Sequence, residues 1–193
     1  IDADVTSRPF IFPAAIIFTT AQAGLNITGA AAPQYPGYEW WIDSNCHLRV
    51  RLLSNQTTNK YLGAIGSLSF CDGNLHKVAA SYDGSSTVAG VKMYVDGTSD
   101  TGITSEGTTL SGTIVNAEPF YIGNQRDWPY SLGGTIQHFS LSNVVRNQAW
   151  VQSYTTAAAS VDANTVLAIA DNMGAGGGGG AGTTLAPGYT AGS

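Results

Sequence analysis

The residues best suited to chemistry lie in one short stretch, Arg126-Asp127-Trp128-Pro129-Tyr130. Its two aromatic rings offer flat apolar faces, while the arginine and the aspartate offer a hydrogen-bond donor and an acceptor. A sugar ring has the complementary chemistry, because it can stack on an aromatic face while its hydroxyls bond polar groups. The stretch therefore predicts ligand contacts by Arg126, Asp127, Trp128 and Tyr130. An alternative stays open, in which the two rings fill a protein interface or cover the core.

A second and weaker candidate for ligand contact consists of Tyr35 and Tyr38, with Gln34 beside them. These residues lie where a segment rich in small residues and proline gives way to an alternating strand. They have the same mixture of aromatic surface and hydrogen-bonding groups.

No pattern of catalytic residues accompanies these candidates. Glycoside hydrolysis uses two carboxyl groups, and the nearest pair is Glu39 and Asp43, which share one strand face with Trp41. We interpret that face as solvated, because no other acid extends the pair into a catalytic array. The histidines lack zinc-binding spacing, no serine has the Gly-x-Ser-x-Gly context, and the glycine run lacks a phosphate-binding Lys-Ser/Thr. The sequence predicts a protein that is not an enzyme.

Calcium as a cofactor is an expectation implied by the family resemblance described below, whose members often hold it with loop oxygens. Calcium binds oxygen atoms of carboxylates, amides and backbone carbonyls. The alternative is turn chemistry, in which Asp and Asn side chains accept hydrogen bonds from nearby backbone N–H groups, and we favour it because no contiguous Asp-x-Asp-x-Asp run occurs. The turn acids and amides are Asp43, Asn45, Asp72, Asp83, Asp96, Asn124 and Asp127.

Cys46 and Cys71 allow a single disulfide. Each lies at a turn, and if the strands between them run down and back, both turns fall at the same end of the molecule. Two separate thiols are the alternative, and the sequence leaves both open.

The composition points to a partner that is neither a nucleic acid nor a membrane interior. Of 193 residues 43% are hydrophobic but only 11% are charged, and the net charge is −5. Nucleic-acid binding needs clustered Lys and Arg, and the densest basic cluster is Arg49 with Arg51 on one strand face, which we interpret as solvated. No segment has the roughly 18 apolar residues of a membrane span. A surface of small and hydroxyl side chains is typical of secreted proteins or of subunits that neighbours cover.

Alternating apolar residues predict an all-β domain. Residues 147–155 are the best helical candidate, while 21–37 and 100–111 are expected to be loop. The predicted strands are 9–20, 38–43, 48–53, 60–70, 76–82, 91–95, 119–123, 134–142 and 165–170. Strict alternation in the first hairpin turns one set of side chains inward: Trp40, Ile42, Leu48, Val50 and Leu52.

Five phrases in order carry a resemblance to a known family. They are GYEWWID (37–43), DGNLHKVAASYDG (72–84), VKMYVDG (91–97), PFYIG (119–123) and GTIQHF (134–139). Together they resemble the laminin G-like, concanavalin A-like lectin/glucanase domains over roughly residues 9–155, although Leu75 stands where that family usually has Trp. The resemblance implies an antiparallel two-sheet jelly-roll sandwich that serves recognition or assembly outside the cytoplasm. The carboxylate array of the glucanase members is absent from this chain.

Composition changes near residue 173. We expect a sandwich with a short N-terminal arm over 1–172 and an extended glycine-rich tail over 173–193, which we interpret as an assembly arm that packs on neighbouring subunits. The main expectation is a structural or decoration subunit of an extracellular or viral, phage-like particle. The alternative is a glycan-binding, lectin-like module of a secreted or cell-surface protein. Either function places the chain at an extracellular, cell or virion surface.

Overall fold

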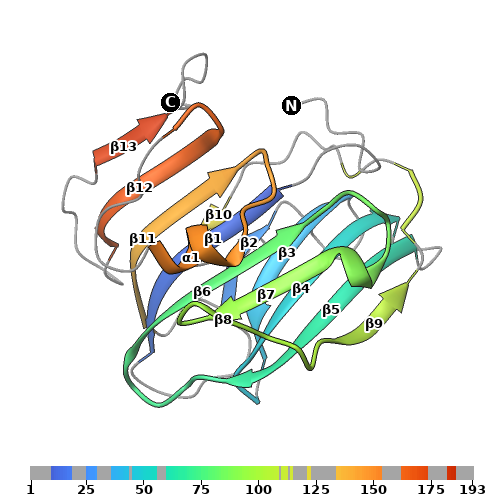
Figure 1. Cartoon of the computed structure of the whole chain (residues 1–193), viewed down its shortest axis with the longest axis horizontal. Helices are drawn as coiled ribbons and strands as arrows, with labels where there is room; N and C mark the ends of the chain where they lie inside the picture. The colour runs from blue at the N-terminus through green and yellow to red at the C-terminus, as the bar shows by residue number, and fades with distance from the viewer. Residues whose placement is uncertain are drawn as a thin grey trace.

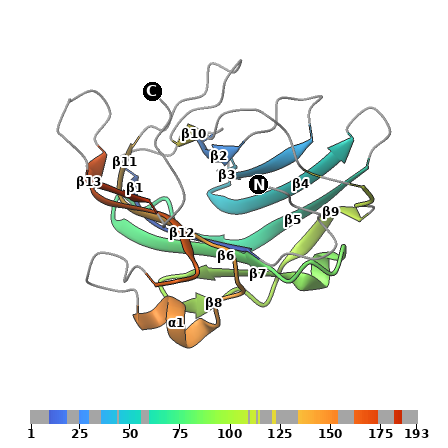
Figure 2. The same cartoon turned by 90° about the horizontal axis from the view of Figure 1, so that it is seen from above.

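The computed structural model describes residues 10–18, 25–29, 36–43, 45–55, 60–108, 110–112, 114, 121–122, 134–153, 162–173 and 182–185. Within these residues the chain forms two antiparallel sheets and almost no helix. The predicted all-β sandwich is confirmed. Figure 2 shows the sheets as two stacked layers.

One sheet has seven strands. In spatial order they are β13 (Gly182–Leu185), β12 (Thr165–Met173), β11 (Gly134–Ser142), β1 (Phe10–Phe18), β6 (Leu75–Tyr82), β7 (Val91–Val95) and β8 (Thr98–Ser99). The first and last segments of the chain thus meet in one sheet, because β1 pairs with both β11 and β6 (Figure 1).

The second sheet has six strands. In spatial order they are β10 (Tyr121–Ile122), β2 (Leu25–Gly29), β3 (Gly37–Ile42), β4 (His47–Asn55), β5 (Lys60–Ser69) and β9 (Thr104–Thr108). The run from β3 to β5 is a meander of consecutive antiparallel strands, so its side chains alternate between the sandwich core and the opposite, outer face.

The hydrophobic core lies between the two layers. The predicted inward residues of the first hairpin are all buried, with Trp40, Ile42 and Leu52 at 0% exposure. From the facing sheet Tyr82, Met93 and Phe139 join the same cluster. Burial of apolar area of this kind is worth about 25 cal/mol per Å², so this cluster supplies the main driving force for stacking the sheets.

The one described α-helix, α1 (Gln148–Ser153), lies within the range predicted as helical. It lies beside β8 on the outside of the seven-stranded sheet (Figure 2). Val151 packs there with Ala79 and Tyr94, and Gln148 and Gln152 both donate hydrogen bonds to the Gly97 carbonyl, at 3.0 and 3.1 Å. The helix thus covers the second face of β6 and β7, which explains why Ala79 and Tyr94 are apolar on that face.

Two strands lie in segments expected to be loop. β2 falls within 21–37 and β9 within 100–111, and the expectation was wrong for both. β9 is a strand of Thr, Ser, Glu and Gly without an apolar residue, so backbone pairing with β5 forms it rather than burial of its own side chains. The short β2 pairs with β3 on one side and β10 on the other. Its five residues are too few to show a clear strand pattern in the sequence, so pairing with these neighbours defines it.

The described part of the glycine-rich tail, β13, pairs antiparallel with β12 of the same chain, from Leu185 opposite Leu167 to Gly182 opposite Ala170. A strand partner within the chain therefore holds these four residues. The N-terminal arm and the rest of the tail lie outside the described residues.

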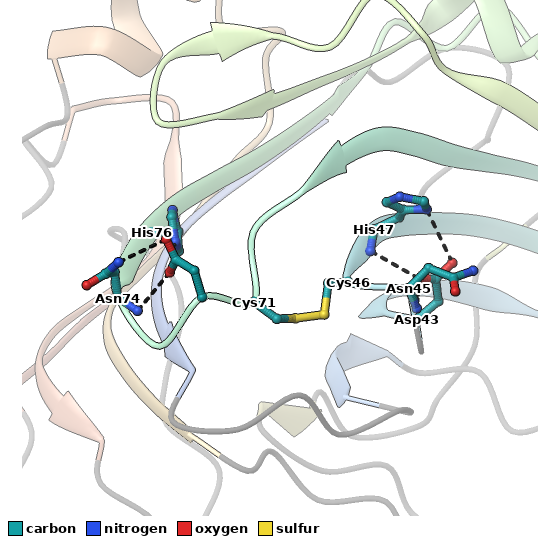
Figure 3. Close-up of a disulfide and its surroundings, with 8 residues drawn as sticks. Asp43, Asn45, Cys46, His47, Cys71, Asn74 and His76 are labelled. Atoms are coloured by element: carbon teal, nitrogen blue, oxygen red, sulfur yellow. Dashed lines mark hydrogen bonds and ion pairs between the residues drawn. A yellow bond between two sulfur atoms is a disulfide. The ribbon is translucent and has the colours of Figure 1, made fainter.

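A disulfide joins Cys46 and Cys71, whose Cα atoms are 5.5 Å apart. Cys46 lies in the β3–β4 turn with a positive φ of 64° and Cys71 follows β5, so the two turns meet at one end of the sandwich. Figure 3 shows Asp43 and His47 on one side of the bridge, and Asn74 and His76 on the other. Of the two alternatives left open by the sequence, the structure has the bridge.

Candidate functional site

Polar and aromatic side chains gather on the outer face of the six-stranded sheet. In the β3–β4 register Glu39 lies opposite Arg51 and Trp41 opposite Arg49. Because Trp40 and Val50 point into the core, the residues alternating with them point away from it. We call the following set the outer-sheet cluster: Glu39, Trp41, Asp43, Arg49, Arg51, Tyr61 and Glu106.

Ion pairs organise this cluster. Arg51 pairs with Glu39 directly across the two strands. Arg49 donates from Nε to Asp43 Oδ2 at 2.9 Å and from Nη1 to Glu106 Oε2 at 3.1 Å, so it connects β3, β4 and β9. The arginine side chains are about one-quarter exposed, at 24% and 25%, whereas Glu39 is only 4% exposed. The two arginine side chains are therefore held in place and remain partly exposed.

Two aromatic rings lie against the arginines. The Trp41 ring centroid is 5.9 Å from the Arg49 guanidinium and 5.5 Å from that of Arg51. The Tyr61 centroid is 6.0 Å from Arg51. At these distances a cation is attracted to an aromatic face, so the rings and the guanidinium groups fix one another's orientation.

Glycine in β9 makes room for the Tyr61 ring. A Cβ atom at Gly107 would lie 2.3 Å from the Tyr61 ring, so the ring rests directly on the β9 backbone. The Tyr61 hydroxyl donates to the Glu106 carbonyl at 3.2 Å. Tyr61 therefore lies flat at the rim of the sheet instead of extending away from it.

Asp43 is held as a carboxylate. Burial acts to raise its pKa, but hydrogen bonds from the His47 backbone, the Arg49 side chain and the Asn45 backbone outweigh burial and lower the pKa. These bonds also shape the turn that carries Cys46, because Asp43 Oδ1 accepts from the N–H groups of Asn45 and His47 at 2.9 and 3.0 Å.

The turn acids act as backbone acceptors. Asp43, Asp72 and Asp83 each accept a hydrogen bond from the N–H group two residues later, which is the turn chemistry weighed against calcium binding. Asp96 accepts instead from the Lys77 N–H at 2.9 Å. Among the residues that the structure describes, no group of three or more His, Cys, Asp or Glu side chains could hold a metal ion.

Most of the ligand contacts predicted from the sequence lie outside the described residues: Arg126, Asp127, Trp128, Tyr130 and Tyr35. Tyr38 is described and packs against the hydrophobic core, on the face of β3 opposite the outer-sheet cluster. Burial raises the pKa of Tyr38 to about 12.

The sequence predicted the strand faces of several groups in the outer-sheet cluster but not their contacts. The face of Glu39 and Asp43 was interpreted as solvated, which is wrong, because these side chains are buried in ion pairs with the arginines. Glu39, Trp41 and Asp43 were expected on one strand face, and Arg49 with Arg51 on another. The four-residue turn between those strands was sufficient to set Glu39 against Arg51. Tyr61 and Glu106 carried no such signal, because β5 pairs with irregular register and β9 was not expected to be a strand.

Sequence comparison identifies one family. The family profile of the concanavalin A-like lectin/glucanases superfamily, in its laminin G form, matches residues 14–152. Comparison with curated proteins gives no match.

Solved structures with the same fold include two proteins connected with carbohydrate. A candidate carbohydrate-binding protein from Bacteroides ovatus has a TM-score of 0.61 at 16% identity; the match covers 93% of this chain and 54% of that one, so this chain spans about half its length. The CBM40 of a Ruminococcus gnavus IT-sialidase has a TM-score of 0.58 at 12% identity over 78% of this chain and 84% of that one. A heptameric SAP-like pentraxin from Limulus polyphemus has a TM-score of 0.52 at 16% identity over 78% and 70%. At these identities the likeness concerns the fold.

Proposed function

The chain belongs to the concanavalin A-like lectin/glucanase superfamily, and we propose that it is a non-enzymatic glycan-binding module that binds sugar on its outer-sheet cluster. Among the structures with its fold are the CBM40 of a sialidase, also solved with α2,6-sialyllactose bound, and a candidate carbohydrate-binding protein. These similarities support glycan binding more than they support a role in particle assembly.

The observation that carries the proposal is the position of Trp41. Its ring is half-buried on the outer face of the six-stranded sheet, and the guanidinium groups of Arg49 and Arg51 lie over the ring, 5.9 and 5.5 Å from its centroid. A sugar that stacks on the ring has guanidinium N–H groups as donors and the Glu106 carboxylate as an acceptor at its edge. Sheet strands hold all these groups, so little conformational entropy is lost when a ligand orders them.

The same geometry argues against hydrolysis at this site. A glycosidase needs one carboxyl group with a raised pKa to act as an acid. Glu39 forms an ion pair with Arg51, and Asp43 has a lowered pKa because of its hydrogen bonds. Asp43 is therefore held as an anion and Glu39 is engaged in an ion pair, so neither is suited to act as the acid.

The aromatic stretch 126–130 is proposed as a second contact. In the sequence it follows β10 by a few residues, and β10 is the end strand of the sheet that carries the cluster. In this proposal Trp128 and Tyr130 also stack on the glycan.

The proposed location is outside the cytoplasm. A disulfide persists in oxidising compartments and is rare in reducing ones. In the described part of the chain no helix is long and apolar enough to cross a membrane.

Assembly is the second candidate function, and the position of β13 favours it. This tail strand ends the seven-stranded sheet, and an end strand offers backbone groups with which a strand of another subunit can pair. If the tail is an assembly arm, the full chain sediments as an oligomer and a chain ending at Met173 sediments as a monomer. If both are monomers, the tail serves its own domain and self-assembly through the tail is excluded.

The test of glycan binding is Trp41→Ala on an immobilised glycan panel. We expect binding to weaken at least about tenfold, which corresponds to ~1.4 kcal/mol, because the stacking surface is lost while the ion pairs remain. The matched control is Trp150→Ala, which removes a partly buried tryptophan from α1 near the other sheet. Trp128→Ala measures the contribution of the stretch 126–130 to binding separately from that of the sheet. Equal loss in Trp41→Ala and Trp150→Ala, or unchanged binding in Trp41→Ala, contradicts the proposed site.

A further inference from the structure

The charges of the outer-sheet cluster indicate which class of glycan it accepts, an inference that rests on the proposed function. Two arginines face three carboxylates, so the cluster carries a net charge of −1. Among the described residues, every ion pair of Arg49 and Arg51 is with a member of this set. The cations that could attract an anionic sugar are therefore already neutralised within the protein.

An acidic ligand would have to displace one of these carboxylates. The Glu39 side chain is 4% exposed and that of Asp43 is 10% exposed. Removing the arginine partner from so buried a carboxylate leaves an uncompensated charge, which is strongly unfavourable. Glu106, 36% exposed, is easier to displace, but Asp43 2.9 Å from the same guanidinium then repels the incoming anion.

A hydroxyl meets no such obstacle. It can accept a hydrogen bond from a guanidinium N–H and donate one to a neighbouring carboxylate oxygen at the same time. Arg49 and Glu106, joined at 3.1 Å, offer this donor and acceptor side by side at the exposed rim of the cluster. Vicinal hydroxyls on a stacked sugar ring can satisfy both groups without breaking the internal ion pairs.

We propose that the outer-sheet cluster selects uncharged sugars and discriminates against carboxylated or sulfated ones. The neutralised arginines act as hydrogen-bond donors to hydroxyls, and the surplus carboxylate repels anions. The ligand class is thus a neutral, hydroxyl-rich glycan.

The test uses pairs of glycans that differ only in acidic groups, presented to the full chain on one panel. Suitable pairs are the methyl ester of α2,6-sialyllactose with its free acid, methyl-esterified polygalacturonan with polygalacturonate, and dextran with dextran sulfate. We expect the neutral member to bind at least about tenfold more tightly wherever a pair binds. Lower ionic strength should widen the difference, because repulsion is less screened.

A charge variant then tests the cause. Glu106→Gln removes the surplus carboxylate, and the ratio of acidic to neutral binding should rise several-fold. The control is Asp83→Asn, which makes the same change in net charge at an exposed turn beyond β6 and should leave that ratio unchanged.

The outcomes separate this inference from the proposed function. Trp41-dependent binding in which acidic members equal or exceed neutral ones overturns the inference and leaves glycan binding standing. An equal rise in Glu106→Gln and Asp83→Asn also overturns it, since the effect is then one of overall charge. Absence of Trp41-dependent binding across the panel overturns the proposed function and the inference with it.

Discussion

His76, at the start of β6, has a carboxylate at each ring nitrogen. Nε2 lies 2.7 Å from Asp72 Oδ1 and Nδ1 lies 2.8 Å from Asp96 Oδ2. A neutral imidazole can donate from only one nitrogen, so both contacts are hydrogen bonds only when the ring is protonated. Burial acts to lower the pKa of His76, but the bonds to Asp72 and Asp96 outweigh it and raise the pKa. Asp72 lies in the turn after Cys71 and Asp96 follows β7, so His76 connects these two segments.

This arrangement predicts a pH dependence of stability. The folded-state pKa of His76 lies above the unfolded value of about 6.5, so its contribution is complete below pH ~6.5 and disappears as the pH rises through the folded-state pKa. The free energy of unfolding of the wild type should therefore exceed that of His76→Gln most at acidic pH. Urea unfolding of both proteins between pH 5.5 and 9 measures the difference. A difference that grows with rising pH would contradict a protonated His76.

At the scale of elements, Asp100 holds the crossing between the sheets. It follows β8 of the seven-stranded sheet and precedes β9 of the six-stranded sheet, and it is 6% exposed. Its Oδ2 accepts from the N–H groups of Ser67 and Leu68 at 2.6 and 3.2 Å, and its Oδ1 from the Ser67 hydroxyl and the Gly102 N–H at 2.6 and 2.9 Å. Burial acts to raise the pKa of Asp100, and these bonds lower it.

Asp100→Asn should therefore destabilise the fold although it preserves volume. In either orientation the new NH₂ group faces a backbone N–H that had an acceptor, and the expected cost is about 1–3 kcal/mol. Chemical denaturation at pH 7 measures it. Asp83→Asn, at an exposed turn, is the control and should stay within about 0.5 kcal/mol of the wild type. Because a lowered pKa stabilises only while the carboxyl is ionised, the cost should shrink as the pH falls below about 4; a constant cost contradicts this account.

The elements show which parts of the fold the sequence could predict. The hairpin of β3 and β4 was predictable, because alternation and turn residues agree there and each strand buries a full apolar face. β9 was not, since none of its residues is apolar and pairing with β5, a distant segment of the chain, forms it. The same holds for the candidate site. The position of Glu39 opposite Arg51 was predictable from the short turn between β3 and β4, whereas the contact of Glu106 with Arg49 depends on the pairing of β9 with β5. Pairing between distant segments leaves no local pattern in the chain.

At the scale of the whole molecule, the disulfide stabilises the end of the sandwich at which the chain crosses from one sheet to the other. Cys46 belongs to the β3–β4 turn of the six-stranded sheet, and Cys71 lies between β5 of that sheet and β6 of the other. The bond therefore links a hairpin turn to a crossover, and it neighbours the His76 contacts that hold the same crossover from the other side (Figure 3). Asp43, a member of the outer-sheet cluster, lies three residues before Cys46, so the bridge also supports one edge of the candidate site.

Removing the disulfide should lower the free energy of unfolding but leave glycan binding intact. A closed loop of 25 residues in sequence separation lowers the entropy of the unfolded chain enough to contribute about 3 kcal/mol. A Cys46→Ser, Cys71→Ser double variant should show that loss in urea unfolding, and a reducing agent should shift the wild type by the same amount. The double variant in reducing agent is the control and should not shift further. Glycan binding at 25 °C should persist, because the strands of the six-stranded sheet, and not the turn, carry Trp41, Arg49 and Arg51. An equal response to the reducing agent in both proteins would show that the stability change does not arise from this bond.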